Sequence, residues 1–197
     1  MKTENIPGWF PILQQILTIN LLKKYNYSEC VGVEVGCLHG RSSATIAKTI
    51  DKGKLYCIDL WDGRESYDPD YDDNMILLKH LPYKGLKNTL EIFLENTKDI
   101  TNIIPIQGYS PECVSDWNKP IDFIFLDASH ENPSDRNNID FWLPKIKPGG
   151  MFLGHDYFED RIFPDVNTNV EYMEDLLKQK VNILPKTSIW YFNIAKT

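Results

Sequence analysis

The sequence lacks several features that would assign it to common protein classes. It has no apolar run of membrane-spanning length, and its first residues form no signal-peptide pattern. Basic residues form no dense run, and 21 Lys and Arg against 28 Asp and Glu leave a net charge of −7. We therefore expect a soluble cytoplasmic protein whose main partner is neither a membrane nor a nucleic acid.

Cysteine is scarce and scattered. The four cysteines, at positions 30, 37, 57 and 113, form no C-x-x-C pair, which argues against a zinc site and against a disulfide framework. We expect four buried, reduced thiols. The chain also has no internal repeat or low-complexity tract, and 42% of its 197 residues are hydrophobic. This composition predicts one folded domain over residues 1–197.

Residues 31–43 organise the rest of the sequence. They read Val-Gly-Val-Glu-Val-Gly-Cys-Leu-His-Gly-Arg-Ser-Ser, which predicts a strand, a tight turn and the start of a helix. Gly36 and Gly40 bracket the turn, and glycines there let a ligand approach the backbone. Ser42 and Ser43 are typical of a helix start, where unpaired N–H groups can bind a ligand.

A second predicted strand, residues 54–60, carries an aspartate at its carboxyl end. Asp59 lies nineteen positions after Gly40, close to the separation found in nucleotide-binding α/β units. An acidic side chain at this place accepts hydrogen bonds from ribose hydroxyls. Trp61 follows, and two alternatives are open for it: packing near an adenine, or an ordinary place in the core.

Two later strands also end in polar residues. The apolar run 121–126 is followed by Asp127 and His130, and the run 151–154 is followed by His155 and Asp156. Ligands of open α/β sheets bind at the carboxyl ends of strands. Because an unpaired buried carboxylate is costly, Asp127 needs a metal ion, a cationic cofactor or a substrate hydroxyl as its partner.

These motifs together resemble those of the class I S-adenosylmethionine-dependent methyltransferases. The segments that carry the resemblance are E-x-G-x-x-x-G at 34–40, C-I-D-L-W-D-G at 57–63, L-D-x-x-H at 126–130, L-P-x-I-K-P-G-G at 143–150 and H-D at 155–156. The chain is most similar to the macrocin-type sugar O-methyltransferases and the cephalosporin hydroxylase-like group, from about Gly32 to Tyr157. The resemblance implies a Rossmann-like fold.

The alternation of strands and helices independently favours a three-layer α/β fold. We expect a mostly parallel, seven-stranded sheet that closes with an antiparallel hairpin over residues 181–194. Residues 1–25 predict an aromatic lead-in and a helix, with Trp9 and Phe10 either capping the core or contacting a second copy in a homodimer. Residues 62–85 predict an acidic insertion beside the site.

The resemblance also assigns cofactor contacts. It implies that Glu34 and Gly36 hold the methionine end of S-adenosylmethionine through its amino group. After the strand at 103–107, methyltransferases of this class carry Gly-Asp-Ser, where this chain has Gly108, Tyr109 and Ser110. Since Tyr109 replaces the aspartate that lies near the adenine, we expect Ser110 or a backbone group to take its place.

A metal site and a proton acceptor are implied at the later strand ends. Metal-dependent members hold Mg²⁺ at the positions of Asp127, His155 and Asp156. An imidazole is not the oxygen ligand that Mg²⁺ prefers, so a softer divalent cation would accept His155 more easily. His130 falls where catechol-type members place a basic residue, and an imidazole can take a proton from a hydroxyl near neutral pH. The alternatives are a helix-start hydrogen bond for His130 and a satisfied turn pair for the other two.

The sequence thus predicts methyl transfer from S-adenosylmethionine to a hydroxyl oxygen of a small molecule, a sugar or a phenol. One alternative is a nucleotide-dependent oxidoreductase on a related sheet, although the spacing from Gly36 to Gly40 suits the methyl donor better. The other is a non-catalytic relative that binds the cofactor, or nothing, and acts as an interaction module.

Overall fold

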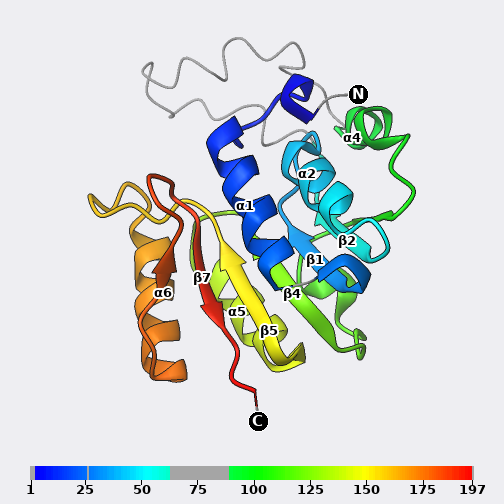
Figure 1. Ribbon diagram of the computed structural model, residues 1–197. Helices are drawn as coiled ribbons and strands as arrows, with labels where there is room; N and C mark the ends of the chain where they lie inside the picture. The colour runs from blue at the N-terminus through cyan, green and yellow to red at the C-terminus, as the bar shows by residue number, and fades with distance from the viewer. Residues whose placement is uncertain (1–2, 26, 63–88, 197) are drawn as a thin grey trace.

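The computed structural model describes residues 3–25, 27–62 and 89–196, which form an α/β fold (Figure 1). Among these residues seven strands build one sheet, in the order β3-β2-β1-β4-β5-β7-β6. The strands are β1 (Val31–Val35), β2 (Lys54–Asp59), β3 (Ile103–Gln107), β4 (Ile121–Leu126), β5 (Ile146–Gly154), β6 (Asn182–Ile183) and β7 (Trp190–Asn193). The first five are parallel, and β7 runs antiparallel to both β5 and β6.

Helices cover both faces of the sheet and give it two hydrophobic cores (Figure 1). The α-helices are α1 (Ile12–Lys24), α2 (Arg41–Thr49), α4 (Leu90–Thr97), α5 (Ser134–Trp142) and α6 (Pro164–Leu177). Short 3₁₀ turns are η1 (Thr3–Asn5), η2 (Tyr27–Glu29), η4 (Glu112–Val114) and η5 (Leu143–Lys145). Because side chains alternate along a strand, Phe123 and Phe125 pack with α1, α2 and α4, whereas Ile124 packs with α5 and α6.

The register of the parallel strands brings four strand ends into line. The last paired residues of β2, β1, β4 and β5 are, in that order, Ile58, Val35, Leu126 and Gly154, and each is aligned with the next. One further backbone hydrogen bond extends each pairing, for example from the Asp127 N–H to the Val35 carbonyl at 2.9 Å. The residues that follow these ends therefore emerge along one edge of the sheet.

The structure confirms the expected fold class, including the antiparallel hairpin of β6 and β7. One strand is longer than predicted: β5 starts at Ile146 and includes Pro148 and both following glycines, with a register shift against β4. Most of the acidic insertion predicted at 62–85 lies outside the described residues. In the described part of the chain no helix has the length and apolar character needed to cross a membrane.

Two expectations about single residues are settled by burial. Phe10 is buried against Phe125 and so caps the core, as one of the two alternatives had it, while Trp9 is half-buried. Of the four free cysteines three are buried, but Cys113 is exposed, so the prediction of four buried thiols is wrong at that position. Cys113 lies in η4, a short turn at the surface beyond β3.

Candidate active site

The turn after β1 lies directly against the end of β4. Gly36 has a φ of +85°, and a Cβ at this position would lie 1.8 Å from the carbonyl oxygen of Asp127. Only glycine allows both the left-handed backbone and this approach. The turn ends at Gly40, which has a φ of +90° and precedes the first turn of α2, where Ser42 and Ser43 lie.

Asp59 fixes this turn from the end of β2. One carboxylate oxygen accepts hydrogen bonds from the N–H groups of Cys37 and Leu38, at 2.6 and 2.9 Å, and the other accepts from the N–H of Trp61 at 2.8 Å. A carboxylate has about four lone-pair sites, so capacity remains for a ribose hydroxyl. In this structure, Asp59 binds and fixes the backbone of the turn.

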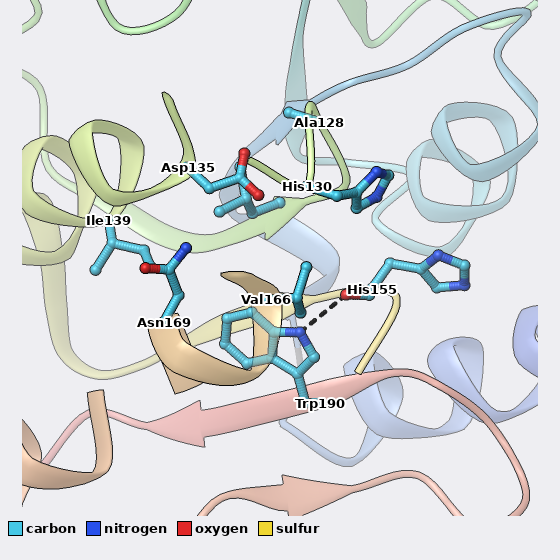
Figure 2. Close-up of a pocket in the computed structure, with 9 residues that line it drawn as sticks. Ala128, His130, Asp135, Ile139, His155, Val166, Asn169 and Trp190 are labelled. Carbon is cyan, nitrogen blue, oxygen red and sulfur yellow. Dashed lines mark hydrogen bonds between the residues drawn. The ribbon is translucent and has the colours of Figure 1, made fainter. Parts of the chain in front are cut away.

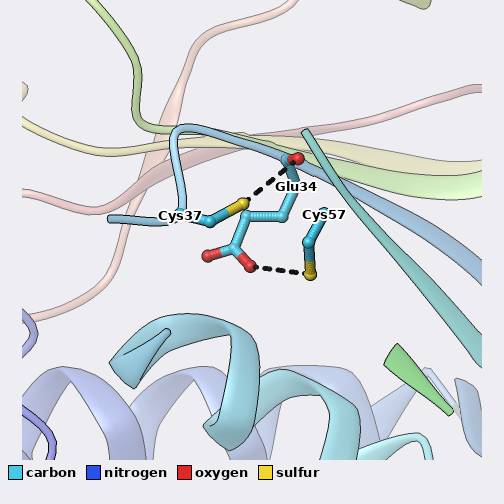
Figure 3. Close-up of side chains that lie close together, drawn as sticks. All are labelled: Glu34, Cys37 and Cys57. Carbon is cyan, nitrogen blue, oxygen red and sulfur yellow. Dashed lines mark hydrogen bonds between the residues drawn. The ribbon is translucent and has the colours of Figure 1, made fainter. Parts of the chain in front are cut away.

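Glu34 is fully buried below the turn (Figure 3). Its Oε2 accepts a long hydrogen bond from the Cys57 thiol at 3.7 Å, whereas its Oε1 has no hydrogen-bond partner among the described residues. Burial raises the pKa of Glu34 to about 7, although the nearby hydroxyls of Ser42 and Ser43 oppose the shift. An unpaired buried carboxylate oxygen is costly, so a cationic group at this point would be stabilising.

Two residues that were predicted to contact the cofactor, Trp61 and Ser110, direct their side chains toward other protein groups. Trp61 is fully buried, packs on Phe93 with 4.6 Å between ring centroids, and belongs to the core, which was one of its two alternatives. The hydroxyl of Ser110 donates to Asn138 at 2.6 Å and is buried. Gly108 directly follows β3, and its N–H donates to the Asp59 carbonyl at 2.9 Å, so a backbone contact with an adenine stays a prediction.

Two carboxylates and two imidazoles meet at the ends of β4 and β5. His130 Nε2 lies 3.3 Å from Asp127 Oδ1 and 3.0 Å from Asp156 Oδ2. His155 Nδ1 lies 3.4 Å from Asp127 Oδ1 and 3.1 Å from Asp156 Oδ1. Each imidazole thus contacts both carboxylates. The structure brings together all four residues that the sequence singled out at these strand ends.

The charged groups of this cluster shift one another's pKa values. Burial acts to lower the pKa of each imidazole, but the two carboxylates outweigh it and raise the pKa of His130 and of His155 to about 10. Burial likewise acts to raise the pKa of Asp127, but the neighbouring histidines hold it below its usual range. Without a further ligand, the cluster is therefore two imidazolium–carboxylate pairs at neutral pH.

The same atoms form a donor set for a divalent cation. Asp127, His130 and Asp156 each offer one ligand atom, and these atoms lie within 4.8 Å of one another. The predicted set had His155 in place of His130, and the Nδ1 of His155 also faces both carboxylates. Oxygen and imidazole ligands together suit a first-row transition ion better than Mg²⁺.

A hollow adjoins the two histidines (Figure 2). Its cavity volume is about 10 Å³, room for about one water molecule, and α5 and α6 contribute Asp135, Ile139, Val166 and Asn169 to its lining. The sequence analysis did not single out Asp135 or Asn169. Asp135 lies in the first turn of α5, and its position five residues after His130 was the signal that could have found it.

Comparison with known proteins identifies the family. Residues 33–157 match the family model described as a methyltransferase domain. The chain belongs to this methyltransferase family. The matched segment spans β1 to the residues after β5, so it includes the glycine turn and the whole carboxylate–imidazole cluster. The family therefore supports methyl transfer from S-adenosylmethionine over the oxidoreductase alternative.

Solved structures share the fold of this methyltransferase at low sequence identity. A "putative caffeoyl-CoA O-methyltransferase" from Staphylococcus aureus is 17% identical, with 98% of this chain and 88% of that chain covered and a TM-score of 0.63. Cofactor-bound Rv0187 from MTB is 13% identical, with 98% and 85% covered and a TM-score of 0.64. CalS11, a calicheamicin methyltransferase, is 14% identical, with 93% and 80% covered and a TM-score of 0.64.

The close approach at Gly36 gives a first prediction. Gly36→Ala is expected to lower the free energy of unfolding by at least about 2 kcal/mol, because the new Cβ separates the turn from β4. Gly149→Ala is the matched control: its φ is +82°, but its Cβ would meet only the flexible Lys196 side chain, at 3.2 Å. Urea denaturation measures both variants, and an equal loss in the two would contradict the role given to Gly36.

The ionic cluster predicts how stability depends on pH without bound cation. Both histidines have folded-state pKa values of about 10, above the value near 6.5 expected on unfolding, so their protons stabilise the fold. This contribution is complete below pH 6.5 and is lost as the pH rises. Between pH 7 and 8.5, we expect the free energy of unfolding to fall by roughly 1.4 kcal/mol per pH unit for each histidine.

Urea denaturation in EDTA across that pH range measures the slope. The range stops at pH 8.5 because unfolded tyrosine titrates above it. Unfolded cysteine and folded Glu34 titrate within the range and add to the slope, so the difference between the wild type and His130→Gln, which lacks one imidazole and should have the smaller slope, isolates the histidine contribution. A flat profile in the wild-type protein would show that the imidazoles are neutral in the folded state.

Proposed function

We propose that this methyltransferase transfers the methyl group of S-adenosylmethionine to a hydroxyl oxygen of a small molecule, a sugar or a phenol. The observation that supports it best is the pairing of Asp127 and Asp156 with two imidazoles beside a hollow, at the strand ends next to the glycine turn. Such a cluster is suited to removing a proton from a hydroxyl.

The cofactor fits the residues of the turn. The unpaired Oε1 of Glu34 is a buried acceptor suited to the ammonium group of the methionine end. The left-handed backbone at Gly36 and Gly40 shapes the turn that leads into α2, and the start of α2 at Ser42 and Ser43 suits the carboxylate. Asp59 keeps acceptor capacity for the ribose hydroxyls while it holds the turn.

The reaction is a displacement at the sulfonium methyl group. The substrate oxygen forms a bond to the methyl carbon, the carbon–sulfur bond breaks with its electron pair staying on sulfur, and the hydroxyl proton leaves. The imidazole of His130 would accept that proton at Nδ1, because Nε2 faces the acceptors Asp127 and Asp156 and therefore carries a hydrogen. Holding oxygen and methyl in line supplies much of the acceleration.

The raised pKa of His130 sets a condition on this role. An imidazole that is already protonated cannot act as a base, and the charges of Asp127 and Asp156 are what raise its pKa to about 10. A divalent cation held by the two carboxylates and an imidazole would neutralise that charge and lower the pKa of the substrate hydroxyl. We propose that the enzyme uses such a cation, held by Asp127, Asp156 and His155.

The cofactor proposal predicts a specific loss of affinity. Glu34→Gln keeps the size of the side chain but removes its charge, so S-adenosylmethionine should bind about 10-fold more weakly, a change of about 1.4 kcal/mol. Isothermal titration calorimetry measures it. Methylthioadenosine lacks the amino acid end and serves as the control ligand, since its affinity should be the same for both proteins. Equal loss for both ligands would mean that Glu34 does not bind the ammonium group.

The base assignment predicts the effect of removing His130. His130→Ala should bind S-adenosylmethionine as the wild type does, while turnover falls by about 10²- to 10⁴-fold. The wild-type protein is first assayed with labelled cofactor against a panel of sugars and phenols, with EDTA, Mg²⁺ or Co²⁺. Glu131→Ala, at the exposed neighbouring position, is the control. Unchanged turnover in His130→Ala would refute the assignment, and no transfer to any panel member would argue for the non-catalytic alternative.

A further inference from the structure

A glutamine from α1 reaches the imidazole of His155. Gln14 Oε1 lies 3.0 Å from His155 Nε2, a contact between residues 141 positions apart, and both side chains are buried. Gln14 Nε2 donates to the hydroxyl of Ser188 at 3.3 Å, and that hydroxyl lies 3.2 Å from the same imidazole nitrogen. None of these contacts is needed to build the sheet, yet all three polar side chains are buried around one nitrogen.

The contacts decide which ring nitrogen carries a proton. Because the amide N–H of Gln14 points at Ser188, its carbonyl oxygen faces His155 Nε2. Two acceptors cannot face each other at this distance, so Nε2 must be the nitrogen that carries a hydrogen. When the ring is neutral, the lone pair is therefore on Nδ1, which faces Asp127 and Asp156 at 3.4 and 3.1 Å.

The ring of His155 is also held by its surroundings. Phe10 and Phe125 lie near it, with 6.3 and 6.4 Å between ring centroids. Its backbone carbonyl accepts a hydrogen bond from the indole of Trp190 at 3.0 Å, drawn as a dashed line in Figure 2. His155 thus presents Nδ1 to the carboxylates from a rigid, almost completely buried position.

His130 differs from His155 in exposure and in backbone geometry. Its side chain is 22% exposed against 4% for His155, and it stands in a left-handed turn with a φ of +59°, where its ring packs on Phe163 with 4.8 Å between centroids. A metal ligand needs a fixed ring and a second partner that orients it, whereas a group that exchanges protons with a substrate needs access. The two imidazoles are therefore suited to different tasks.

We propose that Gln14 and Ser188 are positioning residues that fix Nδ1 of His155 as a ligand, and thereby select a transition ion of the Co²⁺ or Zn²⁺ class over Mg²⁺. His130 is then left for proton transfer. The inference rests on the proposed function for the use of the cation, but the selection itself is a property of the binding site. A ligand imidazole whose other N–H is bonded to a carbonyl oxygen is the arrangement that favours metal binding.

Calorimetry of the full chain with Co²⁺ and with Mg²⁺, without any methyl acceptor, tests the proposal. The wild type should bind Co²⁺ more tightly than Mg²⁺, and Gln14→Leu should weaken Co²⁺ binding by about 10- to 100-fold. Gln14→Glu keeps an acceptor for the Nε2 hydrogen and should retain most of the affinity. Ser188→Ala is a milder second variant, expected to weaken Co²⁺ binding in the same direction.

Gln15→Leu is the matched control. Gln15 is the next residue of α1 and is also buried, but its hydrogen bonds go to the Phe10 carbonyl at 2.9 Å and to the hydroxyls of Thr3 and Thr45, and none of these goes to His155. It should lose stability as Gln14→Leu does but keep the wild-type affinity for Co²⁺. If Gln15→Leu loses as much affinity as Gln14→Leu, the effect is structural and the proposal fails.

A change of ligand gives a spectroscopic reading of the same site. His155→Asn replaces nitrogen with oxygen, so the Co²⁺ absorption bands should shift and the preference should move toward Mg²⁺. Unchanged bands in His155→Asn, or no binding of either cation by the wild type, would overturn the inference. Binding of S-adenosylmethionine is measured separately, so a wild-type protein that binds this cofactor but prefers Mg²⁺ to Co²⁺ would overturn this inference while the proposed methyl transfer stood.

Discussion

The mutual neutralisation of two aspartates and two histidines is the interaction on which the rest of the site depends. Asp127 and Asp156 leave adjacent strand ends in a space largely closed to water, where like charges would repel and an unpaired charge would be costly. Each imidazole contacts both carboxylates, so the cluster persists only as a whole. The glycine turn of β1 can pack against the Asp127 backbone because that strand end is held in place from the other side.

The sequence predicted the framework of this arrangement well, because the framework follows from local patterns. Apolar runs located the strands, and a polar residue after each run located the strand ends that parallel pairing brings together. For Asp127 the sequence predicted a metal ion, a cationic cofactor or a substrate hydroxyl as the partner, whereas its carboxylate contacts His130 and His155. Both histidines were among the residues that the sequence singled out, but not as partners of Asp127.

What the sequence could not predict depends on side-chain direction and on contacts between distant segments. Asp59 was placed correctly at a strand end, but its bonds to the turn backbone follow from rotamers that no pattern encodes. The apolar pattern of the helix that holds Gln14 would turn Ile12, Leu13 and Ile16 toward the core, but these three are exposed and Gln14 is buried. Its contact with His155 spans 141 positions. Ser110 was expected at a ligand because a related motif has a serine there, whereas its hydroxyl bonds to Asn138.

The cluster also exposes a conflict between stability and chemistry. In the folded protein the carboxylates keep both imidazoles protonated, and this stabilises the fold. A protonated imidazole, however, cannot accept a proton from a substrate. A proton acceptor appears at His130 only when something else balances Asp127 and Asp156. In the proposed mechanism, Gln14 orients the buried ring of His155 for a cation, whereas His130 is the more exposed of the two imidazoles. The cation would then be bound at His155 and the base released at His130, so the difference between the two histidines would convert a stabilising ion cluster into a catalytic one.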